Sequence, residues 1–256
     1  MTAAQDVVAG FAAPFETFDA WFADASAACA PGEWATPMTL ATATADGAPS
    51  ARMVLMQRSR VGGVAFYTNG ESRKAGEFGA NPRAAAVFFW PKIQRQVRLE
   101  GVVRPATVAE SDEYFASRPR GSQLAAWASA QSRPLPGGSA QLRAEVAAVA
   151  ERFAAPGEAA AAAAPHATPL LGLATAPPAA TAGAGAAGGA SVAVAELPPF
   201  PRPAHCGLYW LEPSRVEFWR EGEFRMHERV EYTARVTRSD GSVDPGAGWA
   251  VRNLYP

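Results

Sequence analysis

Near the start of the chain, hydrophobic and polar residues follow a helical spacing. The stretch 14–28 carries four aromatic side chains at that spacing, namely Phe15, Phe18, Trp21 and Phe22. This pattern predicts an amphipathic helix that covers a hydrophobic core. From Met38 the spacing changes, and runs of residues with high β-propensity replace the helical pattern.

Two hairpins are predicted in the region that begins at Met38. The β-prone runs on either side of Asp46-Gly47 indicate a tight turn, because glycine adopts the positive φ that such a turn requires. Residues 52–57 and 64–68 are expected to pair in the same way across Gly62-Gly63.

Helices and further strands are predicted in the middle of the chain. Helices are expected over 72–80, 107–117 and 141–153, and strands over 84–90 and 94–104. Ser72 is placed to cap the first helix, and Thr107 with Glu110 forms a capping-box pattern at the second. Pro91 ends the first of these strands.

The C-terminal part again has the pattern of strands. They are expected over 207–211, 215–219, 224–235 and 249–254, with Glu221-Gly222 as a turn between two of them. Short strands in hairpins, with a few helices attached, predict a mainly β (α+β) fold: an antiparallel barrel with peripheral helices.

Composition divides the chain into three parts. Residues 154–203 are dominated by Ala, Gly and Pro, with few large apolar side chains to offset the entropy of ordering. We therefore expect a flexible insertion at 154–203, between a first part of the domain at 1–153 and strands at 204–256 that complete the barrel and the substrate site.

Charge and cysteine content narrow the class of protein. The formal net charge of −1 argues against a general nucleic-acid binder, so any anion must be held by local basic clusters. Two cysteines far apart in sequence, Cys29 and Cys206, argue against a disulfide framework and favour a reducing compartment. No secretory signal and no membrane span are recognised, so a cytoplasmic location is expected.

The candidate chemistry lies in basic and polar residues on or beside the predicted strands. Dinucleotide-binding, Walker, nucleophile-elbow and metal-ligand patterns are absent from the sequence, and no metal is expected. Arginine is suited to bidentate contact with phosphate, and it recurs in several short clusters. Two separate groups of basic residues would suit two phosphorylated ligands.

A series of short motifs occurs in order along the chain: RMVLM at 52–56, FYTN at 66–69, SRK at 72–74, NPR at 81–83, RQVR at 95–98, YFASRPRGS at 114–122, QS at 131–132, VEFWREG at 216–222, RMHER at 225–229 and WAVRNLYP at 249–256. Together these motifs resemble the ordered signature of the pyridoxine (pyridoxamine) 5′-phosphate oxidase family. The resemblance implies an FMN-binding antiparallel split β-barrel that works as a homodimer with shared active sites.

The resemblance also implies which residues bind FMN. Arg52 and Met53 would follow the flavin along one strand, and Tyr67 and Thr68 would contact it from the next. Further cofactor residues would be Arg73 and Lys74 at the phosphate, Gln96 at the ring, Gln131 and Ser132 from the partner subunit, and Trp219 and Arg229 completing the pocket. The position of Arg73 and Lys74 at the start of the helix predicted over 72–80 would suit binding of a phosphate.

The implied reaction is oxidation of pyridoxamine or pyridoxine 5′-phosphate to pyridoxal 5′-phosphate, with O2 reduced to H2O2. Tyr114, Arg118 and Ser122 would meet the substrate phosphate. Arg225 and His227, expected to alternate on one strand and so to share a face, would be the catalytic pair at the substrate ring.

One substrate position departs from the family pattern. Gln57 stands where the family usually has a lysine at the substrate phosphate, and weaker substrate binding is expected. The neighbouring Arg58 is not expected to compensate, because adjacent strand residues face opposite sides. Two alternatives stay open: a split-barrel FMN reductase with another electron donor, and a non-catalytic protein that binds FMN or pyridoxal phosphate.

Overall fold

The computed structural model describes residues 7–10, 12–154 and 200–256, and these form two compact units. The first unit contains the described residues up to Ser111, the loop 130–133 and everything from Ala204 onward. The second contains 112–129 together with the described residues between 134 and 203. The greater part of the predicted insertion, 155–199, lies outside the described residues, and its flexibility stays a prediction.

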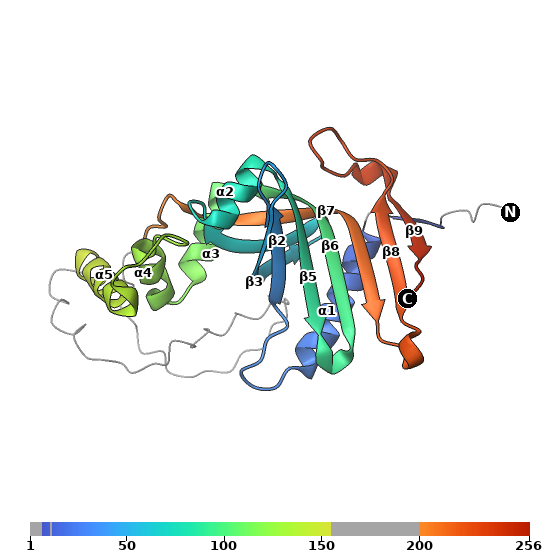
Figure 1. The fold of residues 1–256 in the computed structure, drawn as a ribbon, viewed down its shortest axis with the longest axis horizontal. Coiled ribbons are helices and arrows are strands. Elements are labelled where there is room, and N and C mark those ends of the chain that lie inside the picture. The colour runs from blue at the N-terminus through green and yellow to red at the C-terminus, as the bar shows by residue number, and fades with distance from the viewer. Residues whose placement is uncertain (1–6, 11, 155–199) are drawn as a thin grey trace, which may run out of the picture. The chain divides into compact units, whose positions relative to one another are not determined.

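The first unit is the predicted antiparallel barrel (Figure 1). Its strands are β1 (Val7–Ala9), β2 (Pro37–Ala43), β3 (Pro49–Arg60), β4 (Gly63–Asn69), β5 (Arg83–Trp90), β6 (Arg95–Pro105), β7 (Cys206–Arg220), β8 (Glu228–Ala234) and β9 (Trp249–Asn253). They pair in the order β1-β9-β8-β7-β4-β3-β2-β5-β6, and pairing of β6 with β7 closes a six-stranded ring. The predicted fold class is therefore confirmed.

Alternation along the strands fills the inside of the ring with apolar side chains. Leu40, Ala86, Leu99 and Val216 lie opposite one another on β2, β5, β6 and β7, and all are buried. Cross-strand partners share a face, so this row belongs to the core side of the sheet. The polar residues between them, such as Gln96 and Arg98 on β6, point outward and are half-buried.

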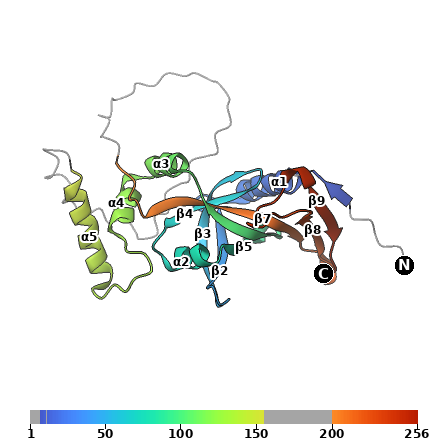
Figure 2. The ribbon, with the colours of Figure 1, turned by 90° about the horizontal axis from the view of Figure 1, so that it is seen from above.

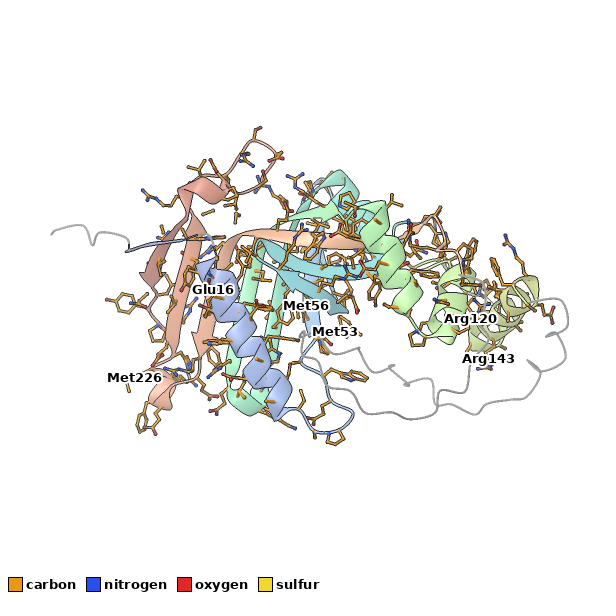
Figure 3. The ribbon with its side chains drawn as sticks, turned by 180° about the vertical axis from the view of Figure 1, so that it is seen from behind. Glu16, Met53, Met56, Arg120, Arg143 and Met226 are labelled. Carbon is orange, nitrogen blue, oxygen red and sulfur yellow. The ribbon has the colours of Figure 1, made fainter. Side chains whose placement is uncertain are left out.

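The predicted N-terminal helix is present as α1 (Ala13–Ala28), which crosses the sheet in the view from behind (Figure 3). Phe18 packs on Phe88 of β5 with ring centroids 5.2 Å apart, and Trp21 packs on Phe218 of β7 at the same distance. These edge-to-face contacts explain the helical spacing of the aromatic residues in the sequence.

Several local predictions are confirmed. Gly47 and Gly62 adopt positive φ, 92° and 107°, in the turns that follow β2 and β3. Helix α2 (Arg73–Ala80) begins directly after Ser72, and α3 (Val108–Ser117) carries the capping box. There, the Thr107 amide donates to Glu110 Oε2 at 2.8 Å and the Glu110 amide donates to Thr107 Oγ1 at 3.1 Å.

The second unit is helical. It contains the end of α3, α4 (Arg120–Ala128) and α5 (Gly138–Arg152), which Figure 2 shows from above. Phe200 stacks on Phe115 at 6.2 Å and meets Phe153 edge-to-face at 4.4 Å, so residues after the undescribed stretch complete this small core. Helix α4 was not predicted, and α5 begins three residues before the expected Gln141. Within the described residues, no helix has the length and apolar character needed to cross a membrane.

Two predicted C-terminal strands are in fact one. The expected segments 207–211 and 215–219 belong to the single strand β7, which pairs with β4 through its first half and with β6 through most of its length. A register shift at Glu100/Gly101 accommodates Pro213 in the middle of β7. Gly101 is required there, because a Cβ at this position would lie 2.0 Å from the Glu212 carbonyl oxygen.

The prediction of a strand over 224–235 was wrong at its start. Residues Glu223–Arg225 form a short 3-10 turn, in which Phe224 and Arg225 have φ of 54° and 64°, and β8 begins only at Glu228. Two short 3-10 turns also occur at Pro91–Ile93 and Pro245–Ala247. Arg225 and His227 therefore do not alternate on a strand, and the expected common face does not exist.

A β-bulge on β3 corrects the expectation for Gln57 and Arg58. Met56 pairs with Phe66 and Arg58 pairs with Ala65, so Gln57 is an extra residue between two consecutive partners on β4. Phe66 faces the core and Ala65 faces the other way, which puts Arg58 on the face opposite to Met56. Gln57 and Arg58 consequently share that face, contrary to simple alternation.

Candidate functional site

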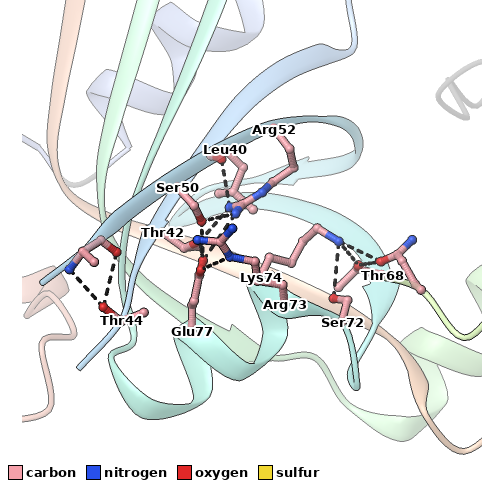
Figure 4. Close-up of polar contacts among 12 residues, drawn as sticks. Leu40, Thr42, Thr44, Ser50, Arg52, Thr68, Ser72, Arg73, Lys74 and Glu77 are labelled. Atoms are coloured by element: carbon pink, nitrogen blue, oxygen red, sulfur yellow. Dashed lines mark hydrogen bonds and ion pairs between the residues drawn. The ribbon is translucent and has the colours of Figure 1, made fainter. Parts of the chain in front are cut away.

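The start of α2 forms a cradle around the Lys74 side chain (Figure 4). Lys74 Nζ donates to Gln131 Oε1 at 2.7 Å, to Thr68 Oγ1 at 3.1 Å and to Ser72 Oγ at 3.3 Å. The side chain is buried, with 8% of its surface exposed. Among the described residues, no carboxylate lies within ion-pair distance of Nζ, so all three donors meet neutral oxygens.

This environment suits an anion. Burial lowers the pKa of Lys74, and the neighbouring Arg52 lowers that pKa further, while the charge of Glu77 acts in the opposite direction. A buried ammonium group held only by neutral acceptors is stabilised when a negative group binds beside it. The N-terminus of α2 adds the positive end of the helix dipole, although this helix has only two turns.

One contact in the cradle differs from the sequence-based expectation, and another involves a residue that is expected to act in a partner subunit. Ser72 occupies the N-cap position of α2, but its hydroxyl accepts from Lys74 instead of capping a backbone amide. Gln131 accepts within its own chain from Lys74 and from Thr68 Oγ1, the latter at 3.0 Å, and its contribution to the site of a partner subunit stays a prediction. Ser132, beside it, has a φ of 73°.

A buried carboxylate, Glu77, lies on the next turn of α2. Glu77 Oε2 accepts from Thr42 Oγ1 at 2.5 Å and from Ser50 Oγ at 2.6 Å, and Arg52 Nη2 lies 3.3 Å from the same oxygen. Arg73 Nε donates to Glu77 Oε1 at 2.8 Å. Burial raises the pKa of Glu77, but these hydrogen bonds and the charge of Arg52 outweigh burial and bring the pKa to about 2.

Arg52 is turned into this network and not toward open solvent. Its Nη1 donates to Thr42 Oγ1 at 2.6 Å and to the Leu40 carbonyl oxygen at 3.2 Å, and its Nη2 donates to Ser50 Oγ and to Glu77. Met53, one residue on, points to the opposite side of β3 and is 61% exposed. Tyr67 precedes Thr68 on β4 and is half-buried.

A second group of predicted cofactor residues forms a row across three strands. Gln96 of β6 lies opposite Trp219 of β7, which lies opposite Arg229 of β8. Arg229 Nε donates to the buried Glu217 at 2.9 Å, and this bond raises the pKa of the guanidinium. The side chains of the row are half-buried on the outer face of the sheet.

The two groups lie on opposite sides of the barrel wall. Arg52 is the cross-strand partner of the core residue Leu40, and Thr68 lies two residues from the fully buried Phe66, so both belong to the core side. Gln96 directly precedes the buried Val97 and therefore belongs to the outer side. In one chain, the cradle around Lys74 and the row of Gln96, Trp219 and Arg229 are thus separated by a strand layer.

The predicted catalytic and substrate residues are only partly brought together. His227 packs on Trp219 with ring centroids 4.8 Å apart, and its Nδ1 accepts from the Gly222 amide at 3.3 Å. Arg225 is exposed in the preceding turn, and Gln57 lies in the bulge of β3. Tyr114, Arg118 and Ser122 belong to the second unit, on and between α3 and α4.

Sequence reasoning missed Glu77, Thr42 and Ser50. The only signal for Glu77 was its position four residues after Arg73 on a predicted helix, a spacing that brings side chains together on one face. Thr42 and Ser50 gave no signal, because only the pairing of β2 with β3 brings them beside Glu77. Glu217, which holds Arg229, was likewise not recognised.

Two family models match the chain. Residues 33–153 match the model described as pyridoxamine 5′-phosphate oxidase, and residues 207–256 match the pyridoxine 5′-phosphate oxidase C-terminal dimerisation region. Among curated proteins, the pyridoxine/pyridoxamine 5′-phosphate oxidase of Anaeromyxobacter dehalogenans is 41% identical over 232 residues, covering 91% of this chain and 90% of the relative. The same-named protein of Bordetella pertussis is 38% identical over 245 residues, covering 96% and 90%.

Solved structures agree on the fold. PhzG from Burkholderia lata, in complex with tetrahydrophenazine-1-carboxylic acid, superposes with a TM-score of 0.68 at 24% identity and covers 95% of this chain and 92% of its own. A pyridoxamine 5′-phosphate oxidase-related, FMN-binding protein from Nostoc punctiforme superposes with a TM-score of 0.59 at 14% identity, with both chains covered completely.

Proposed function

The chain belongs to the pyridoxine (pyridoxamine) 5′-phosphate oxidase family, and on that basis we propose that it oxidises pyridoxamine or pyridoxine 5′-phosphate to pyridoxal 5′-phosphate with FMN as cofactor. O2 is the proposed electron acceptor and is reduced to H2O2; the amine substrate also takes up water and releases ammonia. The observation that carries the proposal is the buried Lys74, held by neutral oxygens in a cradle suited to an anion.

The residues of the first unit fit FMN in two groups. Lys74, Thr68 and Arg73 would hold the phosphate, since they place two cationic side chains and a hydroxyl at the start of α2. Gln96, Trp219 and Arg229 would contact the ring system, because they offer an amide, an aromatic surface and a charge in one row. Bound FMN supplies the hydride acceptor for this reaction and passes the electrons to O2.

A site shared between two chains is part of the proposal. The match of residues 207–256 to a dimerisation region supports a homodimer. The two groups of proposed cofactor residues face opposite sides of the barrel wall in one chain, which favours a site that takes one group from each subunit. The exposed Met53 and Phe89 on the outer face are consistent with a surface that a second copy covers.

The substrate is proposed to lie against His227 and Arg225. His227 contacts Trp219, so it is already beside a proposed flavin residue, and Arg225 in the adjacent exposed turn adds a positive charge. These side chains would orient the substrate ring for transfer of hydride from its 4′ carbon and would stabilise the charge that develops on the ring during this transfer. Tyr114, Arg118 and Ser122 are proposed to bind the substrate phosphate, with Gln57 as an uncharged further contact.

Anaerobic mixing of the FMN-loaded protein with pyridoxamine 5′-phosphate tests this function. We expect the flavin absorbance to bleach and to recover when air is admitted, with formation of pyridoxal 5′-phosphate. A flavin that stays oxidised at saturating ligand would contradict the oxidase. Reduction by a reduced nicotinamide instead would then identify a reductase, and binding without reduction by either donor would identify a binding protein.

A further inference from the structure

We propose that Glu217 is a positioning residue for the flavin ring: its carboxylate fixes the guanidinium of Arg229 in the place where this side chain meets the cofactor. The inference rests on the proposed FMN function, in which Arg229 contacts the ring system, and deepens it. Glu217 acts through Arg229 and not by touching the cofactor. Both residues lie on the outer face of the sheet, where β6, β7, β8 and β9 are neighbours (Figure 1).

Glu217 is buried although its side chain leaves the core. It stands between the core residues Val216 and Phe218 on β7, so alternation turns it to the outer face, yet only 4% of its side chain is exposed. Oε1 accepts from Arg229 Nε at 2.9 Å, and Arg229 Nη2 lies 2.9 Å from the same oxygen. Oε2 accepts from Arg98 Nη1 at 3.2 Å. A carboxylate held from β6 and β8 at once has a defined position.

Arg229 depends on Glu217 for its position. Besides the two contacts with Glu217, its Nη1 donates to the Tyr255 carbonyl oxygen at 2.9 Å. Among the described residues, no other carboxylate lies within ion-pair distance of this guanidinium. The hydrogen bond to Glu217 is the main reason why the pKa of Arg229 is raised. Without the carboxylate, one neutral carbonyl would be left to hold a long and mobile side chain.

The fixed guanidinium belongs to the row of proposed ring contacts. Arg229 is the cross-strand partner of Trp219, and Trp219 is the partner of Gln96. Glu217 lies diagonally from Arg229 on the same face, a separation that a long side chain spans. With 26% of its side chain exposed, Arg229 still reaches the surface. Because the guanidinium is planar and held at Nε, its remaining N–H groups point in defined directions, as contact with the edge of a flat ring requires.

A second buried carboxylate lies directly opposite and provides a matched control. Glu231 of β8 is the cross-strand partner of Glu217 and is 3% exposed. Its Oε2 accepts from Arg215 Nε at 2.6 Å, and Arg252 Nε lies 3.0 Å from its Oε1. The two carboxylates thus share the same face, the same burial and two arginine partners each. They differ in one respect: only Glu217 holds an arginine that is proposed to contact the flavin.

The test measures binding of FMN and of riboflavin, which lacks only the phosphate, to the cofactor-free protein. The wild type, Glu217→Gln and the control Glu231→Gln are titrated with each flavin, and urea denaturation without flavin measures the stability of each protein. Glu217→Gln should weaken binding of both flavins by the same factor, about ten-fold, because the lost contact is at the ring and not at the phosphate. Glu231→Gln should change both affinities by less than about two-fold at a comparable loss of stability.

Three results would overturn the inference. Equal losses of flavin affinity in Glu217→Gln and Glu231→Gln would show that the two carboxylates act only through the stability of the sheet. A loss for FMN alone would place the effect of Glu217 at the phosphate. Unchanged binding of both flavins by Glu217→Gln would show that Arg229 needs no carboxylate. A wild-type protein that binds neither flavin would contradict the proposed function itself, so the two failures are distinguishable.

A double-mutant cycle with Arg229→Gln tests whether Glu217 acts through Arg229. In the Arg229→Gln background, Glu217→Gln should cause no further loss of flavin affinity; losses that multiply would contradict the positioning role. If Glu217→Gln alone does not fold, Glu217→Asp takes its place, with Glu231→Asp as the control. Glu217→Asp keeps the charge but withdraws the carboxylate from Arg229 by one methylene group. It should weaken both flavins more than Glu231→Asp does, and equal effects of the two variants would overturn the inference.

Discussion

Replacement of Lys74 by methionine should affect the cofactor-free and the FMN-loaded protein in opposite directions. Methionine has nearly the length and shape of the lysine stem but carries no charge. In the cofactor-free protein, Lys74 is a buried cation with three neutral hydrogen-bond acceptors and no carboxylate within ion-pair distance among the described residues. In the loaded protein the same cation is expected to face a phosphate.

The magnitudes follow from these two environments. A charge-assisted hydrogen bond contributes about 1.5–3 kcal/mol, so Lys74→Met should weaken FMN binding roughly 10- to 150-fold. Without FMN, burying an apolar side chain in place of a cation should raise the free energy of unfolding by about 1 kcal/mol, a figure taken from the lower end of the range for buried ion pairs that are replaced by apolar residues. The gain is small because Thr68, Ser72 and Gln131 lose a donor.

Urea denaturation of both proteins, with and without saturating FMN, measures the two effects together. Lys74→Met should unfold at a higher urea concentration than the wild type when FMN is absent, and should gain less from added FMN. Lys74→Arg, which keeps the charge, is the control and should retain most of the FMN-dependent stabilisation. A cofactor-free Lys74→Met protein that is less stable by more than about 1 kcal/mol, or unchanged FMN affinity, would refute the reasoning.

Three further predictions concern pH, substrate binding and assembly. The pKa of Glu77 is about 2 in the folded protein against 4.5 ordinarily, so the stabilisation that its carboxylate contributes is complete above pH 4.5 and is lost as the pH falls toward 2. Urea denaturation measures the difference in unfolding free energy between the wild type and Glu77→Gln. This difference should shrink as the pH falls from 4.5 to 2 and stay constant above pH 4.5. Gln57→Lys should lower the KM for pyridoxamine 5′-phosphate by about ten-fold, because it replaces a neutral contact by a charge-assisted one, without changing the weak reaction of unphosphorylated pyridoxamine. In sedimentation, flavin absorbance should move with a dimer, and a flavin-loaded monomer would contradict the shared site.

Much of the barrel could be predicted because its signals are local. The spacing of Phe15, Phe18 and Trp21 and the glycine in the turn at Asp46-Gly47 each depend on a few neighbouring residues. The prediction of a strand over 224–235 was wrong at its start because the φ of 54° at Phe224 and of 64° at Arg225 has no local signature in the sequence. Neither phenylalanine nor arginine is a residue type that favours positive φ. The pairing of β7 with β8 and the contact of His227 with Trp219 hold this turn in place, and both are tertiary.

The bulge at Gln57 shows the same limit at a position that is predicted to contact the substrate. Alternation of side chains along a regular strand predicted that Arg58 and Gln57 lie on opposite faces. The one extra residue in the pairing of β3 with β4 places them on the same face instead. Arg58 therefore stands on the face where the substrate contact of Gln57 was expected, and its charge bears on the Gln57→Lys experiment. If Arg58 already supplies the charge, Gln57→Lys should lower KM by much less than about ten-fold, and Arg58→Gln in the wild-type background should raise KM. If Arg58→Gln leaves KM unchanged, the full effect of Gln57→Lys, about ten-fold, is expected.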